Sequence, residues 1–307
     1  MTRVAAVDLG TNSTRLLVAD VEAGRVEEVE RRLRITRLGE GVDRRRRLPP
    51  VAIARVRTCL VEYRRVAERL GAERVLAVAT SAVRDAENGE AFLGEIEWSY
   101  GFSTRLLDGD EEALLTFRGV SAGREVADGT LIVDIGGGST ELILGGSGRV
   151  VFHRSIDLGC VRLTERFGED LAGCAAHVRS SLPALEVSRA IGVAGTVTAL
   201  AALDLGLVEY DPARVHGHRL SRRGIADQLE RLAALPPGER RRVPGLEPER
   251  GPVIVAGAVI LREVLDHYGL EAVEASEHDL LDGAALAASE LPGPQEGAAP
   301  PGAYTCC

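Results

Sequence analysis

The chain has 307 residues, a formal net charge of −9 and no lysine, so all 37 of its basic residues are arginines. A Walker-type phosphate loop, a Schiff-base lysine and a Ser-Lys pair each need an ammonium group, so the composition excludes all three. The acidic balance argues against a nucleic-acid partner, and the length predicts about two domains.

Cysteine content and apolar runs indicate the compartment. The odd number of cysteines leaves one unpaired, and their spacing is not that of a metal site, which together favour a reducing environment. They are Cys59, Cys160, Cys174, Cys306 and Cys307. The longest apolar run, near 253–261, is far shorter than the ~20 residues that span a bilayer. Asp8 interrupts the apolar N-terminal stretch before it can form a signal sequence. We therefore expect a soluble cytoplasmic protein with no membrane partner.

The first half of the chain is predicted to form a three-stranded meander, followed by alternating helices and strands. The expected strands cover 3–8, 14–20, 25–35, 74–79 and 103–107. The expected helices cover 51–70, 88–96 and 109–120, and the stretch 39–50 is expected to be a loop.

The second half repeats this order. Its expected elements are a hairpin at 131–144, strands at 149–156 and 190–194, and helices at 170–186 and 255–268. The last helix is apolar on most faces, which suits either a core or a dimer surface. Both halves also leave a strand through a small, hydroxyl-bearing turn, at 78–83 and at 193–198. The duplication predicts two α/β lobes with a cleft between them.

The two hairpins have nearly the same turn sequence. The segment 8–14 reads DLGTNST, and the segment 134–140, which starts 126 positions later, reads DIGGGST. In each, a carboxylate ends a buried strand beside glycines whose N–H groups can approach an anion closely, which suits a phosphate and its metal ion. Two such hairpins facing each other would bind a phosphate chain from both sides.

A third group of polar residues starts the helix expected at 109–120. Asp108 and Glu111 have the spacing of a capping box, which explains the acidic character of this turn. Glu112 lies about 100° further around the helix, beside the expected apolar face of Ala113, Leu114, Phe117 and Val120. From spacing alone, Glu112 is either an ordinary first-turn glutamate or a carboxylate that deprotonates a water.

A polyanionic substrate would also need a basic path. Candidates for one wall of it, unless they are simply solvated surface residues, are Arg31, Arg32, Arg34, Arg37 and Arg44 to Arg47. His216 and His218 have no third ligand in sequence and are interpreted as loop residues.

The chain resembles the exopolyphosphatase/guanosine pentaphosphate phosphohydrolase (Ppx/GppA) family. The motifs that carry the resemblance occur in family order: the first hairpin, ATSAVR at 79–84, EEA at 111–113, DIGGGSTEL at 134–142, LGCVRLTE at 158–165 and VHGHRLS at 215–221. The resemblance implies an α/β fold with two ribonuclease-H-like lobes of the actin/sugar-kinase/Hsp70 superfamily and an interlobe cleft. The expected lobes are 1–120, with a helix near 280–291 as a candidate addition, and 121–291. A disordered tail is expected at 292–307.

The resemblance also implies roles for single residues. Glu112 matches the family glutamate that activates the attacking water, and Asp134 matches the aspartate linked to Mg²⁺ or another divalent metal, with Asp8 as its counterpart in the first lobe. Arg84 resembles an arginine that contacts substrate phosphate. The expected phosphate loops are Gly10, Thr11, Asn12 and Ser13 with Gly136, Gly137, Gly138 and Ser139.

Two positions depart from the family pattern. Pro252 stands where many members have aspartate, and Leu281 stands where many have arginine. Because the sequence stops near residue 307, we also expect the helical C-terminal domains of the long members to be missing. These differences leave the preferred polyphosphate length and the hydrolysis of guanosine pentaphosphate or tetraphosphate open.

The sequence therefore predicts a metal-dependent hydrolase that releases terminal orthophosphate from inorganic polyphosphate, with guanosine pentaphosphate as a further substrate, acting as a homodimer. One alternative is an ATP-using kinase or ATPase of the same superfamily, because paired hairpins are shared with those enzymes. Another is a non-catalytic regulator that binds alarmones.

Overall fold

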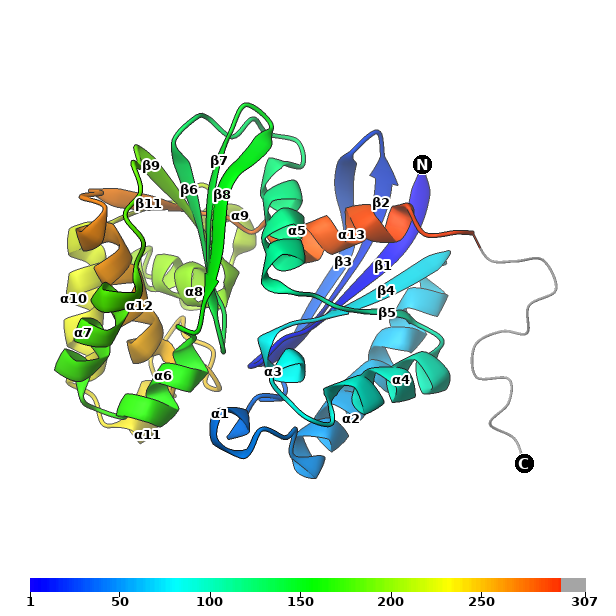
Figure 1. Ribbon diagram of the computed structural model, residues 1–307, viewed down its shortest axis with the longest axis horizontal. Coiled ribbons are helices and arrows are strands. Elements are labelled where there is room, and N and C mark those ends of the chain that lie inside the picture. Colours follow the sequence, from blue (N-terminus) through cyan, green and yellow to red (C-terminus); the bar gives the residue numbers. More distant parts are fainter. Residues whose placement is uncertain (294–307) are drawn as a thin grey trace. The chain divides into compact units, whose positions relative to one another are not determined.

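The computed structural model describes residues 1–293 as an α/β protein with two sheets (Figure 1). The chain divides into two compact units. Unit 1 consists of residues 1–124 and the C-terminal segment that starts at Leu280, and unit 2 consists of Glu125–Asp279. Most of the tail expected at 292–307, including Cys306 and Cys307, lies outside the described residues.

Unit 1 contains a five-stranded sheet in the order β3-β2-β1-β4-β5. Its strands are β1 (Thr2–Leu9), β2 (Ser13–Glu22), β3 (Arg25–Ile35), β4 (Arg74–Ala79) and β5 (Ser103–Leu106). The first three strands pair antiparallel, and β1, β4 and β5 are parallel. All five strands expected in the first half are therefore present.

Unit 2 repeats this sheet. Its order is β10-β11-β9-β6-β7-β8, so β8, β7, β6, β9 and β11 take the places that β3, β2, β1, β4 and β5 have in unit 1. The bounds are β6 (Thr130–Ile135), β7 (Thr140–Gly146), β8 (Arg149–Ile156), β9 (Arg189–Val193), β10 (Arg219–Ser221) and β11 (Ala272–Ala275). The repeated order, a meander followed by parallel strands, confirms the predicted fold class of two ribonuclease-H-like α/β units.

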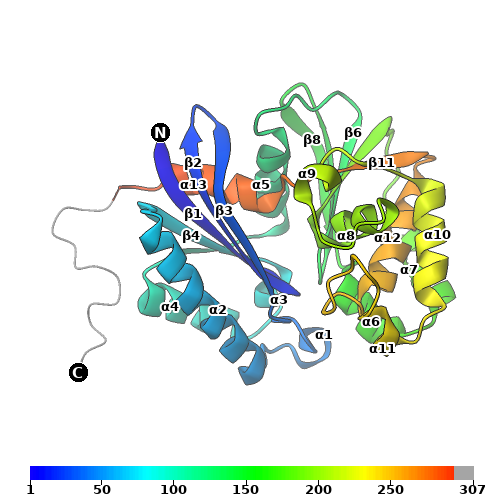
Figure 2. The ribbon, with the colours of Figure 1, turned by 180° about the vertical axis from the view of Figure 1, so that it is seen from behind.

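Helices cover both faces of the unit 1 sheet. Helices α2 (Pro50–Arg69) and α4 (Gly89–Tyr100) lie on one face, as Figure 2 shows, over Ala5, Val7 and Leu9. Helices α5 (Gly109–Ser121) and α13 (Leu280–Ser289) pack together on the other face, against Val4 and Ala6. A Cβ atom at Gly283 of α13 would come within 1.9 Å of the Leu115 carbonyl oxygen of α5, so glycine permits this close helix contact.

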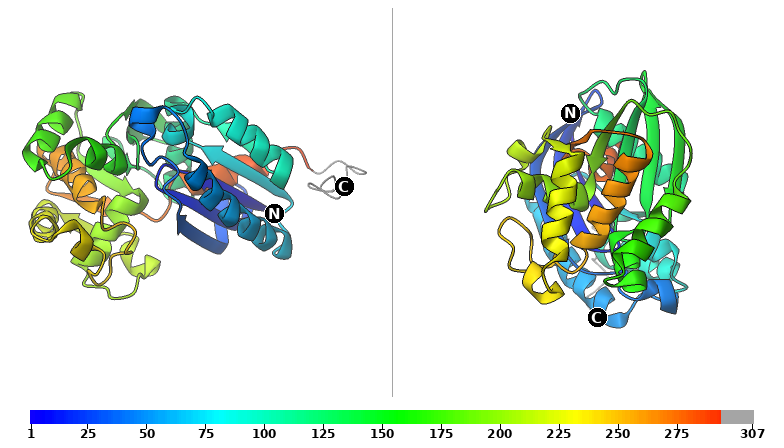
Figure 3. Two further views of the ribbon diagram at one scale, coloured as in Figure 1. Left: turned by 90° about the horizontal axis from the view of Figure 1, so that it is seen from below. Right: turned by 90° about the vertical axis from the view of Figure 1, so that its left-hand side faces the viewer.

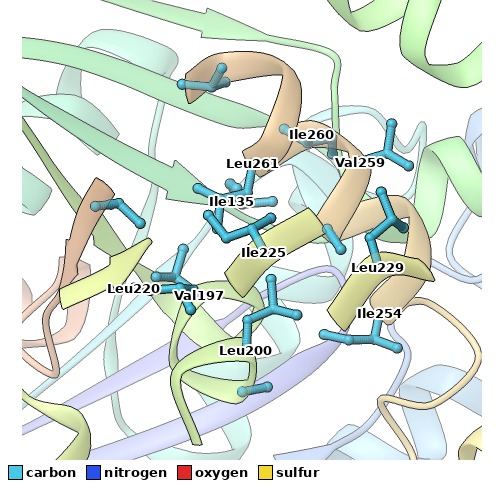
Figure 4. Close-up of a cluster of buried hydrophobic side chains, with 14 of the residues drawn as sticks. Ile135, Val197, Leu200, Leu220, Ile225, Leu229, Ile254, Val259, Ile260 and Leu261 are labelled. Carbon is cyan, nitrogen blue, oxygen red and sulfur yellow. The ribbon is translucent and has the colours of Figure 1, made fainter. Parts of the chain in front are cut away.

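Unit 2 has its core under one layer of helices. These are α6 (Cys160–Phe167), α7 (Leu171–Ser181), α8 (Ala194–Asp204), α10 (Arg222–Ala233) and α12 (Ile254–His267). In the right-hand view of Figure 3, α7, α12 and α10 lie side by side in green, orange and yellow. Figure 4 shows buried apolar side chains of α8, α10 and α12, among them Val197, Ile225 and Ile260, near Ile135 of β6.

Two expectations about helices need correction, and an alternative left open for a third helix is decided. The loop expected at 39–50 contains a short helix, α1 (Val42–Arg45), whose first residue, Val42, is buried. Helix α7 ends at Ser181 and not at 186, because Leu182 precedes a proline and takes an extended conformation. Of the two alternatives expected for the last helix, the core is the one observed, since the apolar residues of α12 are buried within unit 2.

The remaining helices are single turns or were not expected from the sequence. The short ones are α3 (Ser81–Arg84), α9 (Pro212–Val215) and α11 (Pro237–Arg240). Helices α6 and α10 are full helices that the periodicity reading did not include.

Candidate active site

The two hairpin turns have the same backbone geometry. In unit 1, the Gly10 N–H donates to the Ser13 carbonyl at 3.0 Å, and in unit 2 the Gly136 N–H donates to the Ser139 carbonyl at 3.0 Å. A Cβ atom at Gly10 or Gly136 would come within 3.0 or 3.2 Å of the carbonyl oxygen that closes the turn. The predicted phosphate loops are therefore equivalent tight turns, each at the end of a central strand.

The carboxylates beside the loops have different surroundings. Asp8 and Asp134 are 5% and 6% exposed, at matching positions of β1 and β6. The cross-strand partner of Asp8 is Arg15, whose Nε donates to Asp8 Oδ2 at 2.9 Å. The cross-strand partner of Asp134 is Glu141, which is 1% exposed and accepts a hydrogen bond from Ser155 Oγ at 2.8 Å. Asp8 is therefore neutralised by a guanidinium, whereas Asp134 faces a second carboxylate.

The two donor sets differ in the ligands that they could offer a metal ion. Mg²⁺ binds through one or two carboxylates and completes its shell with water and substrate phosphate oxygens. Asp134 and Glu141, opposite one another on the hairpin, fit that requirement. Among residues 1–293, no three His, Cys, Asp or Glu side chains converge as a complete metal site. Glu141 was not among the predicted ligands, although the two-residue period of the paired strands places it on the same face as Asp134.

Glu112 lies in the first turn of α5 and is 5% exposed. Arg84 NH1 donates to Glu112 Oε2 at 3.2 Å and to the Leu107 carbonyl at 2.7 Å. The predicted capping box is present, with Asp108 accepting from the N–H groups of Asp110 and Glu111. The structure thus brings Glu112 and Arg84 together.

The prediction of an apolar face beside Glu112 is only partly confirmed. Ala113, Phe117 and Val120 are buried, but Leu114 is half exposed, because it lies on the outer side of α5.

The unit 1 loop is connected to Arg84 through hydroxyl groups. Thr11 Oγ1 and Ser81 Oγ lie 2.9 Å apart, and Ser81 begins α3, which ends at Arg84. The adjacent Asn12 is 7% exposed, and neither its Nδ2 nor its Oδ1 has a hydrogen-bond partner among the described residues. Because a buried amide without partners costs ~1–3 kcal/mol, Asn12 is a strong candidate for a ligand contact.

The predicted site residues therefore form two groups, each described within its own unit. Unit 1 contributes Asp8, Gly10, Thr11, Asn12, Ser13, Arg84 and Glu112. Unit 2 contributes Asp134, Gly136, Gly137, Gly138 and Ser139, together with the unexpected Glu141.

Cys160 follows the unit 2 loop but is not suited to nucleophilic chemistry. Its N–H donates to the Gly136 carbonyl at 3.0 Å, and its side chain is buried. Burial raises the pKa of the Cys160 thiol above its ordinary value, which disfavours the reactive thiolate.

Three of the arginines proposed to line a basic path have acidic partners within unit 1. Arg31 pairs with Glu28 and with the buried Asp282 of α13. Arg32 and Arg34 both pair with Glu62 of α2. These ion pairs connect β3 to its neighbouring helices, so they give the three arginines a structural role.

The histidines lie in unit 2. His218 Nε2 is 2.8 Å from Asp204 Oδ2, and the His216 ring meets the His278 ring edge to face, with centroids 5.1 Å apart.

The position that departs from the family pattern at 281 also has a structural explanation. Leu281 is fully buried in α13, in the apolar cluster of that sheet face, where a leucine packs well. Pro252 is partly exposed just before α12. None of the helices within residues 1–293 combines the length and apolar character needed to cross a bilayer.

Together, the fold and the loops define the class: an α/β protein with duplicated ribonuclease-H-like units and an acidic glycine turn in each. The chain belongs to the Ppx/GppA phosphatase family, whose model matches residues 17–289. It is therefore a hydrolase, and the predicted family and enzyme class are confirmed.

Several relatives align over nearly the whole chain. Exopolyphosphatase 2 of Mycobacterium tuberculosis is 40% identical over 318 residues, which cover 93% of this chain and 98% of that protein. A crystal structure described as an exopolyphosphatase-like protein has a TM-score of 0.85 at 35% identity and covers 93% and 98% of the two chains. The Ppx/GppA family member of Aquifex aeolicus has a TM-score of 0.78 at 30% identity, with 94% and 97% covered.

Proposed function

We propose that this phosphatase is an exopolyphosphatase, which releases terminal orthophosphate from inorganic polyphosphate and also accepts guanosine pentaphosphate. One observation carries the proposal: the buried Glu112 carboxylate is bound by Arg84 and connected through Ser81 and Thr11 to a glycine turn suited to phosphate. The name of the Mycobacterium tuberculosis relative supports polyphosphate as the substrate.

The chemistry follows from the charges that the reaction develops. Hydrolysis of a phosphoanhydride needs an in-line water and neutralisation of the phosphate oxygens, with little covalent participation by the protein. Backbone N–H groups of a glycine turn donate to the phosphate oxygens, and Glu112 accepts the proton of the attacking water. Arg84 orients Glu112 and contributes positive charge beside the phosphate. The leaving group is the shortened polyphosphate or the nucleotide.

A divalent metal, with Mg²⁺ as the expected ion, would bind at Asp134 and Glu141. Bound there, it would supply positive charge to the phosphate oxygens. The loops, Glu112 and Arg84 perform the remaining steps. A homodimer and a cytoplasmic location remain predictions.

The test is the replacement Glu112→Gln, which keeps the shape of the side chain but removes the proton acceptor. We expect kcat for polyphosphate to fall by about 10²- to 10⁴-fold, the range of general-base contributions, with KM little changed. Asp110→Asn is the matched control, since Asp110 is an exposed acid in the same helical turn. Undiminished phosphate release by the Glu112 variant would exclude this residue as the base.

The same assay separates the alternatives. Phosphate release is measured from short polyphosphate, long polyphosphate, guanosine pentaphosphate and ATP, with Mg²⁺ present and then chelated. Turnover of ATP only with an acceptor would indicate a kinase. Tight binding of guanosine pentaphosphate without any hydrolysis would indicate a regulator.

A further inference from the structure

We propose that Arg162 is a positioning residue that fixes the direction of the N–H groups in the unit 2 phosphate loop. The proposal rests on the proposed function, because it assumes that Gly136–Ser139 binds a phosphate of the substrate. Arg162 lies in the first turn of α6, outside the loop, and its side chain is 11% exposed.

The start of α6 binds the carbonyl side of the loop. The Cys160 N–H donates to the Gly136 carbonyl at 3.0 Å, and the Val161 and Arg162 N–H groups donate to the Gly137 carbonyl at 2.9 and 3.1 Å. The Arg162 side chain completes the series, since its Nε donates to the Gly138 carbonyl at 2.7 Å. Three consecutive loop carbonyls are thus directed toward α6.

The directions of these carbonyl groups also fix the directions of the N–H groups in the loop. In a planar trans peptide, the carbonyl of one residue and the N–H of the next point in opposite directions, and residues 1–293 contain no cis peptide. Directing the carbonyls of 136, 137 and 138 toward α6 therefore directs the N–H groups of 137, 138 and 139 away from it. Successive N–H groups on one side of a turn form an anion-binding concavity. Arg162 binds the Gly138 carbonyl, which belongs to the same peptide group as the Ser139 N–H, so it fixes the direction of that N–H.

The loop and α6 are packed too closely for the arrangement to shift easily. A Cβ atom at Gly159 would lie 2.1 Å from the Gly137 carbonyl oxygen and 2.3 Å from the Gly138 carbonyl carbon. The side chain of Arg162 also approaches Asp157, with 3.6 Å between NH2 and Oδ1, but Asp157 is mostly exposed. A substitution of Arg162 would therefore remove the side-chain hydrogen bond to the Gly138 carbonyl from the loop.

The equivalent turn in unit 1 supports the inference. There, the Thr11 carbonyl accepts from the Gly39 N–H at 2.8 Å, and the Asn12 carbonyl accepts from the N–H groups of Thr36 and Arg37 at 3.1 and 2.9 Å. In both units the segment after the third strand of the meander binds the loop carbonyls. These unit 1 contacts are made by backbone groups, whereas unit 2 also uses a side chain, at Gly138, the position that matches Asn12. The contact to Gly138 can therefore be removed by replacing one side chain.

A guanidinium is well suited to this contact. A charged donor makes a stronger hydrogen bond to a carbonyl than a neutral one, and it polarises the peptide so that the N–H on the other side becomes a better donor. Arg162 thus strengthens phosphate binding without touching the phosphate.

The first experiment compares Arg162→Met with Arg162→Lys in phosphate release from polyphosphate. We expect Arg162→Met to lower kcat/KM about tenfold, mainly through a higher KM, and Arg162→Lys to recover part of the loss because its ammonium can still donate to Gly138. Arg166→Met, one turn further along α6, and Asp157→Asn are the controls, and both should resemble the wild type. A fall in kcat at unchanged KM would show a loss of folded enzyme, and it would overturn the proposal, as would a lysine variant no better than the methionine variant.

The second experiment does not depend on turnover. Inorganic tripolyphosphate is titrated into ¹⁵N-labelled wild type and Arg162→Met without metal, and the amide shifts of Gly137, Gly138 and Ser139 are followed. We expect a shift at Ser139 in the wild type that is lost in the variant, while Gly10 of unit 1 responds equally in both. Equal Ser139 shifts in both proteins would overturn the role of Arg162. If the wild type releases no phosphate from any polyphosphate, the proposed function fails, and these shifts still decide the inference.

Discussion

Two matching residues, Arg15 and Glu141, distinguish the repeats at the residue scale. They occupy the same place across the hairpin from Asp8 and Asp134. Arg15 supplies the positive charge that Asp8 needs when it is buried, while Glu141 adds a negative charge beside Asp134. Because a second carboxylate at the matching position favours a cation more than a guanidinium does, the metal site that we propose is the one in unit 2.

The prediction at this scale compares Asp134→Asn with Asp8→Asn. We expect Asp134→Asn to raise the Mg²⁺ concentration needed for half-maximal activity at least ~10-fold, because half of the carboxylate pair is lost. Asp8→Asn should change that requirement much less, since Arg15 already neutralises Asp8. Metal titrations of phosphate release, together with direct Mn²⁺ binding, measure both effects. Equal shifts in the two variants would show that Asp8 also binds the metal.

Helix α5 is the decisive feature at the scale of the element. The Asp108 capping box fixes its first turn, and Glu112 lies in that turn. Leu281 and Gly283 of α13 pack beside α5 on the same sheet face, so the carboxylate is positioned by a helix that is itself packed on two sides. The cap should therefore matter for activity as well as for stability.

Asp108→Ala tests this link. Loss of an N-cap costs ~1 kcal/mol, and here the fraying should also displace Glu112 and lower kcat. Asp170→Ala is the matched control, because Asp170 caps α7 in unit 2 through the Gly173 N–H and is remote in sequence from any predicted site residue. Thermal unfolding and phosphate release are measured for both. A similar loss of stability with kcat lowered only by Asp108→Ala is the expected result, and equal kcat values would contradict it.

At the scale of the whole molecule, the absence of lysine reduces the number of groups that can change the free energy of unfolding at alkaline pH. Arginine stays charged, so cysteine and tyrosine are the side chains that titrate above pH 8. Burial raises the pKa of Cys59 from 9.0 to about 11 and that of Cys174 from 9.0 to about 11. It also raises the pKa of Tyr268 to about 12. The folded state therefore favours the neutral thiols.

The direction of the pH effect follows from these shifts. A raised pKa in the folded state gives stability that is complete below the unfolded pKa, near 9, and is lost as pH rises to about 11. A rise in pKa from 9.0 to about 11 corresponds to ~2.7 kcal/mol for each thiol as an upper limit, and solvent screening of these incompletely desolvated thiols lowers it. The urea concentration at the unfolding midpoint should fall as the pH rises from 7.5 to 11. In the double variant Cys59→Ala, Cys174→Ala, the midpoint should depend less steeply on pH, even if the lost packing lowers it at every pH. An unchanged slope would exclude the thiols as its cause.

How far the sequence predicts this molecule depends on the range of the interactions involved. The hairpins, the capping box and most strands were predictable because they depend on neighbouring residues: a turn needs Gly10 or Gly136, and a cap needs Asp108. Helices α6 and α10 are not among the predicted helices, although both are amphipathic and Ser221 caps α10, so a local signal for them is present in the sequence. Pro183 signals the end of α7 at Ser181, but the helical pattern of the neighbouring residues predicts a helix that continues to 186.

By itself, the sequence determined the duplication, the two acidic glycine turns, the family and the presence of Glu112, since each is a pattern of residue types along one stretch of chain. Only the tertiary structure decided that Arg84 binds Glu112, that Arg15 faces Asp8 while Glu141 faces Asp134, and that Arg162 binds the back of the unit 2 loop. The physical reason is that charges and hydrogen bonds act over a few ångströms, and the distances between these groups exist only once the strands and helices have packed.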